Sequence, residues 1–341
     1  ANVVRWEMRT RPFLRTAEFL WQEGHTAHAT ADEAVEETVR MLDVYAEFAS
    51  EILAVPVIKG RKSARERFAG AVDTYCIEAM MQDGWALQAG TSHFLGQNFA
   101  KAFDVTFQNV NGEREHVWAT SWGVSTRLIG ALVMAHSDDQ GLVLPPRIAP
   151  VQVVIIPVYK GDDKAVVMEA VDALFATLKG RFRVKVDDRD NLRPGAKYFE
   201  WEQKGVPLRL EIGPRDVAKG QAFAKRRTGG DKFAVPFASA EAVVAEVLEG
   251  IQEQLLDAAT AARDARTHDV TSYEQFKADL VSKSGFYRVP WGGDDADEGR
   301  VKDETRATLR CIPLEQPSVE GLTCPITGKP AHQWAIFARA Y

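Results

Sequence analysis

The N-terminal stretch of this chain decides its fold, and it reads RWEMRTRPFLRTAEFLWQEGH over residues 5–25. Its pattern predicts a strand over residues 3–8, then a turn, then an aromatic-rich segment that starts at Phe13. Side chains two apart on a strand point to the same face, so Arg5 and Glu7 would lie together. Such a pair suits a nucleotide, because the arginine neutralises phosphate and the carboxylate accepts hydrogen bonds from an amine. A surface ion pair is the alternative interpretation of the same two residues.

Two later segments also place polar side chains beside small ones. The sequence LQAGTSH, residues 87–93, has a glycine before its polar string, which suggests a backbone that runs close to a ligand. The sequence WGVSTR, residues 122–127, leads into an apolar segment that is expected to be buried. Taken alone, His93 also fits a hydrogen-bonded polar residue without a ligand. Arg127 also fits an arginine that extends along an apolar surface at a helix start.

In order and spacing, these three segments resemble the motifs of the prolyl-tRNA synthetases, class IIa ligases, of the archaeal/eukaryotic-like type. Residues 5–25 match motif 2 almost letter for letter, residues 90–93 match a Gly-Thr-Ser-His string of the family, and residues 122–127 match motif 3. The resemblance covers essentially all 341 residues. It implies a proline–tRNA ligase that uses ATP and Mg²⁺ to activate proline as prolyl-adenylate and then transfers it to tRNA(Pro). This chemistry needs charge neutralisation and positioning more than a proton shuttle.

The same resemblance implies a role for each polar side chain of the motifs. Arg5 and Arg127 would act in catalysis, and Arg5 would grip the α-phosphate and the prolyl carboxylate. The residues implied in ATP binding are Arg5, Glu7, Arg15, Thr16, Phe19, Gln88, Thr91, Ser125 and Arg127, with Gln88 near the ATP-bound Mg²⁺. The residues implied in proline binding are Arg5, Trp21, Glu23 and His93.

Paired prolines at 145–146 mark a linker after the first unit, because they end regular structure. A β-branched run over residues 151–156 then predicts a strand covered on both faces. It opens an alternation of strands and helices that predicts an α/β domain with a mostly parallel sheet. The predicted fold class is therefore α/β and α+β multidomain. It comprises part of a class II antiparallel catalytic sheet in residues 1–148, an α/β anticodon-binding domain in 149–266 and a small α+β C-terminal domain in 267–341.

Helical periodicity is clearest over residues 30–55, where apolar residues recur near spacings of three and four. Thr30 or Asp32 is expected to cap this helix. The C-terminal domain is expected to open with a helix over residues 271–283 and to contain a loop rich in glycine and aspartate over residues 292–299.

The second domain supplies candidate anticodon residues. Residues 182–190 and 195–216 resemble the anticodon-binding domain of class IIa synthetases, and this resemblance points to Glu202, Arg209, Arg215 and Asp216. Carboxylates and arginines suit guanine, because the acid accepts from the ring N–H and amine while the arginine reaches O6 and N7. Proline anticodons carry two guanines, so the implied partner is tRNA(Pro). Solvated charges on an edge strand are the alternative.

The C-terminal domain departs from the family. Many relatives bind a structural zinc here through two pairs of cysteines, whereas residues 289–297 contain no cysteine and residues 323–328 contain only Cys324. A tetrahedral zinc needs four ligands, so we predict no structural zinc. Asp294 and Asp297 with Cys324 would make at most a weak, accidental metal site. In relatives the C-terminal tyrosine carboxylate reaches toward the active site, and Tyr341 is expected to do the same.

Composition narrows the class of protein. A net charge of −6 excludes a histone-like mode of nucleic-acid binding but allows a local docking patch. Three widely spaced cysteines suit a reducing cytoplasm better than a disulfide framework. No apolar run is long enough to span a membrane. The sequence therefore predicts a soluble, cytoplasmic protein without a membrane partner.

Two features of the family are not found in this sequence, motif 1 and the Thr-x-Glu loop that holds the prolyl amine. We therefore expect that N-terminal part to lie outside this chain, through truncation or a split gene, and the activity of the isolated chain to depend on it. The family resemblance also implies a homodimer for the full-length enzyme. Two alternatives stay open: a non-catalytic tRNA-binding or regulatory paralogue, and a fragment that is inactive on its own.

Overall fold

The computed structural model describes residues 1–341. Their contacts divide the chain into two compact units. The first unit comprises Ala1–Glu51, Val55–Ala135 and Ala259–Tyr341, and the second comprises Ile52–Ala54 and His136–Ala258. The predicted C-terminal domain therefore packs with the N-terminal residues rather than standing apart from them.

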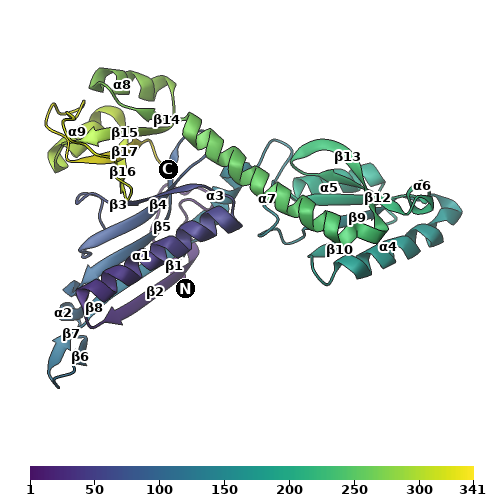
Figure 1. Cartoon of the computed structure of the whole chain (residues 1–341), viewed down its shortest axis with the longest axis horizontal. Helices are drawn as coiled ribbons and strands as arrows, with labels where there is room; N and C mark the ends of the chain where they lie inside the picture. The colour runs from purple at the N-terminus through teal and green to yellow at the C-terminus, as the bar shows by residue number, and fades with distance from the viewer. The chain divides into compact units, whose positions relative to one another are not determined.

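A ten-stranded sheet forms the centre of the first unit, in the order β1-β2-β8-β5-β4-β3-β16-β17-β15-β14 (Figure 1). Every neighbouring pair is antiparallel except β14 and β15. The strands are β1 Asn2–Val4, β2 Glu18–His28, β3 Val57–Arg61, β4 Asp73–Met80, β5 Ala86–Gly96, β8 Trp118–Ser125, β14 Thr267–Asp269, β15 Phe286–Trp291, β16 Thr308–Pro313 and β17 Gln333–Ala338. The predicted antiparallel catalytic sheet is thus confirmed, and the C-terminal strands extend it.

Helix α1 (Ala31–Glu47) covers one face of this sheet, where Leu42 packs with Ile77 and Trp122 (Figure 1). Its start confirms the predicted cap, because the Thr30 hydroxyl accepts from Glu33 N and the Glu33 carboxylate accepts from Thr30 N in return. The helix ends earlier than predicted. A π-helical turn over Phe48–Ile52 follows it, and the next residues leave the first unit.

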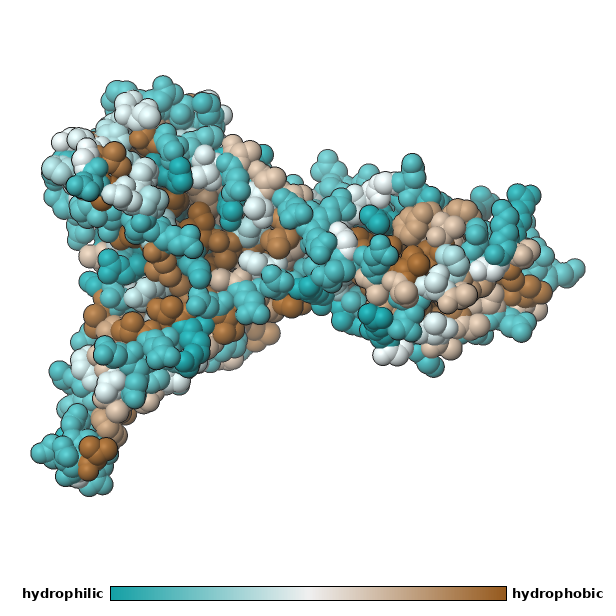
Figure 2. All heavy atoms as spheres, in the orientation of Figure 1, coloured by the Kyte–Doolittle hydropathy of each residue, from teal (hydrophilic) through white to brown (hydrophobic).

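Shorter elements complete the first unit. They are α2 (Asn98–Ala102), the small β6–β7 sheet (Thr106–Gln108 and Arg114–His116), α3 (Arg127–His136), α8 (Tyr273–Ser282) and α9 (Asp295–Thr305). Val110, in the turn between β6 and β7, is fully exposed, and Figure 2 shows a hydrophobic patch at the end of this hairpin. The C-terminal strands and helices share a core in which Phe276 contacts Tyr287 and Phe337.

The predicted loop over residues 292–299 is wrong for its second half, since α9 begins there. The Asp294 carboxylate accepts from the backbone N–H groups of Ala296 and Asp297, each at 3.0 Å. In return, the Asp297 carboxylate accepts from the backbone N–H of Asp294. This capping box, with further acidic side chains in the first turn, starts a helix in a sequence whose glycines suggested a loop.

The second unit is a five-stranded sheet in the order β10-β9-β11-β12-β13. The strands are β9 Val153–Pro157, β10 Val184–Val186, β11 Leu208–Ile212, β12 Gln221–Arg226 and β13 Gly229–Pro236. Strand β9 is parallel to both of its neighbours, β10 and β11. The pairs β11–β12 and β12–β13 are antiparallel. The prediction of a mostly parallel sheet is therefore wrong, because a tight turn into Gly229 and Gly230, both with positive φ, joins β12 and β13 as a hairpin.

Helices cover both faces of this second sheet. They are α4 (Lys164–Leu178), α5 (Pro194–Gln203), the short α6 (Pro214–Ala218) and α7 (Ala240–Ala265), with 3₁₀ turns at Gly161–Asp163 and Phe237–Ser239. Val153 and Ile155 pack in a cluster with α4 and α7, whereas Val154 and Ile156 pack with Trp201 of α5. This alternation confirms the predicted strand that is buried on both sides. None of the helices in either unit has the length and apolar character needed to cross a lipid bilayer.

Candidate functional site

The face of the first sheet that α1 leaves uncovered carries most of the predicted site. Trp21 of β2 pairs with Ser125 of β8, and Thr91 of β5 pairs with Gly123 of β8. Their side chains point away from α1, since the alternate residue Ser92 points toward it and donates a 2.7 Å hydrogen bond to the Thr38 carbonyl. Strand pairing thus brings the three sequence motifs onto one surface.

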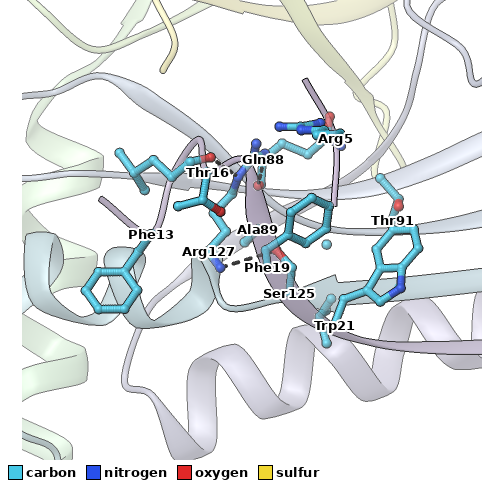
Figure 3. Close-up of a pocket in the computed structure, with 14 residues that line it drawn as sticks. Arg5, Phe13, Thr16, Phe19, Trp21, Gln88, Ala89, Thr91, Ser125 and Arg127 are labelled. Carbon is cyan, nitrogen blue, oxygen red and sulfur yellow. Dashed lines mark hydrogen bonds between the residues drawn. The ribbon is translucent and has the colours of Figure 1, made fainter. Parts of the chain in front are cut away.

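A pocket lies on this surface (Figure 3). It is lined by residues of segment 5–21, β5, β8 and the start of α3, namely Arg5, Phe13, Leu14, Thr16, Phe19, Trp21, Gln88, Ala89, Gly90, Thr91, Gly123, Val124, Ser125 and Arg127. Every predicted nucleotide or proline residue is in this list except Glu7, Arg15, Glu23 and His93. No lining side chain is acidic, so the pocket suits an anion.

Arg127 is the best-fixed cation of the pocket. It is the first residue of α3, and its guanidinium donates from Nε to the Leu14 carbonyl and from Nη1 to the Gln88 carbonyl, each at 3.2 Å (Figure 3). Burial, followed by the charges of Arg5 and Arg15, lowers its pKa from the usual arginine value. Arginine still remains protonated at neutral pH, so positive charge is concentrated here and favours an anionic ligand.

Arg5 and Glu7 do not lie on a strand, and that prediction is wrong. Strand β1 ends at Val4; Arg5 N still donates to the Ala17 carbonyl at 2.7 Å, but the chain then turns, and Glu7 accepts from Arg9 N at 3.2 Å. The turn nevertheless keeps the two side chains together, at 3.8 Å between Nη2 and Oε2. The Arg5 guanidinium also lies 5.2 Å from the centre of the Phe19 ring.

The four predicted residues outside the pocket lining lie close to it in the chain or the sheet. Arg15 is exposed in the turn that precedes β2, and its charge reaches Arg127. Glu23 faces the same side of the sheet as Trp21 and pairs with His25 at 3.2 Å. Glu23 is paired with Gly123 of β8, so it lies on the open face of the sheet, two residues beyond Trp21 along β2.

His93 lies in a small buried cluster on the same face. Its Nδ1 hydrogen-bonds the Thr74 hydroxyl at 3.0 Å, and its ring lies 4.8 Å from the Phe68 ring. Burial lowers the pKa of His93 to about 4, so the imidazole is neutral at physiological pH. Sequence reasoning missed both partners. The pairing of β4 with β5 places Thr74 opposite His93, and no local pattern announces that pairing.

Tyr341 does not line the pocket, but it contacts the segment that does. Its ring lies 5.4 Å from the Trp85 ring, and the Arg11 guanidinium lies 5.5 Å from its centre. The Tyr341 hydroxyl hydrogen-bonds Asp83, and its backbone N donates to the Ala86 carbonyl at 3.2 Å. The C-terminus therefore packs beside the turn formed by residues 5–17.

In the second unit, the predicted anticodon residues fall into two pairs. Arg209 is buried in the central strand β11, where it donates to Glu202 at 2.8 Å and to Glu211 at 3.1 Å and lies 4.1 Å from the centre of the Tyr198 ring. Arg209 is therefore not a solvated charge on an edge strand, which was the alternative considered. Its charge is balanced within the unit.

Arg215 and Asp216 lie in α6 and line a separate pocket of the second unit. The Asp216 carboxylate accepts from Gly213 N at 2.8 Å. Sequence reasoning missed the other polar residues of this pocket, Asp163, Tyr198, Glu211 and Lys232. Of these, Glu211 accepts from Tyr198 at 3.0 Å and from Lys232 at 2.7 Å. Phenol, carboxylate and ammonium groups thus meet at one cavity.

No cluster of three or more histidine, cysteine or acidic side chains in the chain could hold a metal ion. Asp294 and Asp297 instead bind the Lys329 ammonium, at 3.1 and 2.7 Å, and Cys324 is a buried free thiol. In the main pocket, Gln88, Thr91 and Ser125 offer neutral oxygen atoms only. These suit a Mg²⁺ ion that is carried mainly by substrate phosphates and water.

Comparison with known proteins agrees with this geometry. Family models match for the class II core domain of tRNA synthetases (G, H, P, S and T) over residues 2–136, for an anticodon-binding domain over 152–247 and for the prolyl-tRNA synthetase C-terminal domain over 273–341. The proline–tRNA ligase of Chloroflexus aurantiacus is 59% identical over 100% of this chain and 72% of its own length. That of Flavobacterium johnsoniae is 57% identical over 100% and 70%.

A solved structure is similar over the whole chain. The prolyl-tRNA synthetase from Cryptosporidium parvum, in complex with L-proline and AMP, superposes with a TM-score of 0.96 at 40% identity and covers 100% of this chain and 72% of its own. The chain therefore spans about 72% of the length of that relative.

Proposed function

The chain belongs to the prolyl-tRNA synthetase family, aminoacyl-tRNA ligases that use ATP, and from this premise we propose how its residues divide the work. The observation that carries the proposal is the pocket in which Arg5 and Arg127 converge with no acidic side chain in the lining. The reaction joins two anions, a carboxylate and a triphosphate. A site built from fixed cations lowers the cost of bringing them together.

Arg5 and Arg127 are the proposed catalytic residues. A prolyl carboxylate oxygen attacks the α-phosphorus of ATP, the bond from that phosphorus to the bridging oxygen breaks, and pyrophosphate leaves with its electron pair. Arg127 is held by two carbonyl groups, so its charge is in place before the substrates arrive. In this proposal Arg5, which also lines the pocket, neutralises both the α-phosphate and the prolyl carboxylate.

The remaining pocket residues bind ATP. Phe19 offers a ring for the adenine, and Glu7 accepts from its amine, since Glu7 is kept close to Arg5. Arg15 and Thr16 lie against the phosphates or ribose, and Ser125 fixes Arg127 by accepting from its backbone N at 3.2 Å. Gln88 and Thr91 would orient the Mg²⁺ that accompanies ATP, which supplies additional charge neutralisation at the phosphates.

Trp21, Glu23 and His93 form the proposed proline end of the site. A neutral His93 suits a small apolar ring, because an imidazolium would repel the protonated prolyl amine. Glu23 would offer a carboxylate to that amine. Discrimination in such a pocket is limited to about 1–3 kcal/mol per methylene group.

We propose further that tRNA(Pro) binds the second unit through Glu202, Arg209, Arg215 and Asp216. On this proposal the domains divide at 1–148, 149–266 and 267–341. Homodimerisation and a cytoplasmic location belong to the same proposal, and both rest on the family rather than on a contact in this chain.

The test is proline-dependent ATP–pyrophosphate exchange. It would be measured on this chain alone and with an added N-terminal segment that carries motif 1 and the Thr-x-Glu loop. Proline-dependent exchange, by the chain alone or with the added segment, supports the assignment. Exchange only with the added segment would show that the chain needs that segment for activity. Absence of exchange in both, with binding of tRNA(Pro) retained, would favour a non-catalytic RNA-binding protein instead.

A further inference from the structure

A buried cluster of charges lies in the first sheet beside the pocket. The Glu78 carboxylate, on β4, is fully buried and accepts from Lys62 Nζ at 2.8 Å and from Arg310 Nε and Nη2, each at 3.1 Å. Lys62 Nζ also donates to the Arg310 carbonyl at 2.6 Å, and Arg310 Nη1 donates to the Thr308 hydroxyl at 3.0 Å. Each charged group in this cluster therefore has defined partners.

The cluster is adjacent to the pocket through strand pairing. Glu78 lies directly opposite Gln88 in the β4–β5 ladder, and Gln88 lines the pocket and accepts from Arg127 through its carbonyl. Residues paired in this way have their Cβ atoms about 5 Å apart. Their side chains share the open face, because the neighbouring Ile77 packs under α1.

Arg310 comes from β16, which is 232 residues from Glu78 in the sequence. Strand β16 joins the sheet next to β3, and Lys62 directly follows β3. The C-terminal segment thus forms part of the wall behind Gln88.

The charges do not balance within the fold. Lys62 and Arg310 contribute two positive charges and Glu78 one negative charge, so the cluster carries a net charge of +1. Although burial alone would raise the pKa of Glu78, the charges of Lys62 and Arg310 hold it below its usual value, so the carboxylate is ionised. Buried ion clusters contribute little to stability compared with apolar residues of similar volume. An excess positive charge beside a pocket is, however, favourable when an anion binds there.

We propose that Lys62, Glu78 and Arg310 are positioning residues of the nucleotide site, which fix the strand that carries Gln88 and add positive potential for the phosphates of ATP. The C-terminal segment then takes part in adenylate formation through Arg310. This inference rests on the proposed ATP-dependent function. The charges of the cluster reach Arg127, whose pKa is raised by Glu78 and lowered by Arg310, after the larger effects of burial, Arg5 and Arg15.

The test uses pyrophosphate exchange and calorimetric titration with ATP on the same proteins. Arg310→Gln is expected to raise the KM and Kd for ATP by about tenfold, while the KM for proline changes less than about twofold. Arg310→Lys keeps the charge and should recover part of the ATP affinity. Arg288→Gln is the matched control, because Arg288 is an exposed arginine of β15 that pairs with Asp269 and does not line the nucleotide pocket.

A triple variant, Lys62→Met with Glu78→Leu and Arg310→Met, separates the electrostatic role from folding. Apolar replacement of the whole cluster is expected to leave thermal unfolding nearly unchanged but to weaken ATP binding as Arg310→Gln does. Wild-type affinity for ATP in both Arg310→Gln and the triple variant would overturn the inference. The inference would also be overturned if the loss of activity in the variants were fully explained by a smaller fraction of folded protein. If the wild type shows no exchange even with the added N-terminal segment, the proposed function fails, and the titrations with ATP still decide whether the cluster supports nucleotide binding.

Discussion

Acidification should weaken the folded first unit through His93. The imidazole is buried, hydrogen-bonded to Thr74 at 3.0 Å and packed against Phe68, and its pKa is lowered from 6.5 to about 4 by burial. The unfolded chain takes up a proton near pH 6.5, whereas the folded chain does so only near pH 4. The unfolded state therefore binds more protons between these values, and the free energy of unfolding falls as the pH falls through this window.

The size of the effect follows from the shift. One pKa unit corresponds to about 1.4 kcal/mol, so the full difference between 6.5 and about 4 is worth about 3 kcal/mol at or below pH 4. At pH 5.5, where the unfolded histidine is mostly protonated and the folded one is not, the loss is about 1.4 kcal/mol. Above pH 7.5 the contribution is complete and constant.

The assay is urea unfolding, followed by tryptophan fluorescence, of wild type and His93→Gln at pH 7.5 and 5.5. Glutamine can hydrogen-bond Thr74 but does not titrate, and all other groups are common to both proteins, including the buried His136. We expect the wild type to lose about 1.4 kcal/mol more than the variant between these pH values. Equal losses in the two proteins, or an NMR titration of the His93 ring near pH 6.5, would refute the reasoning.

Three further substitutions test separate parts of the structure. Arg127→Gln should lower the kcat of pyrophosphate exchange by about 10²–10³-fold, and an unchanged kcat would remove Arg127 from catalysis. Gly24→Ala places a Cβ 2.3 Å from the Trp122 indole; it should cost about 1–3 kcal/mol in urea unfolding, and wild-type stability would show that the ring can shift freely. Asp187→Ala removes the acceptor of the Trp201 indole N–H at 2.8 Å and of a paired arginine. It should destabilise the second unit by about 1–3 kcal/mol, because the buried indole N–H is left without its acceptor, and calorimetry would contradict this if only the transition of the first unit moved.

The sequence predicted best what depends on neighbouring residues. The cap at Thr30, one of the two residues proposed for it, and the doubly buried strand at Val153–Pro157 each follow from spacing within a few residues. The resemblance to a known family then supplied the convergence of segments far apart in the chain. Eight of its twelve nucleotide and proline residues line one pocket.

What sequence reasoning missed depends on strand order. Periodicity tells which face of a strand is buried, but not which strand lies beside it. Nothing local places Arg310 against Glu78 or Thr74 against His93, because each contact requires the pairing of β4 with its neighbours. The burial of Arg209, which excludes the alternative of a solvated charge on an edge strand, could not be predicted for the same reason, since it follows from the central position of β11.

The distribution of charge in the first unit fits a ligase that positions anions rather than moving protons. Burial, followed by the charges of Arg5 and Arg15, lowers the pKa of Arg127. These like charges repel one another until an anion arrives. The fold holds Arg127 in place against that repulsion with two backbone carbonyls, and the buried His93 is neutral. Binding of a triphosphate would therefore relieve a repulsion that folding has already imposed. Part of the binding free energy of ATP would then come from charges that need no rearrangement when adenylate formation begins.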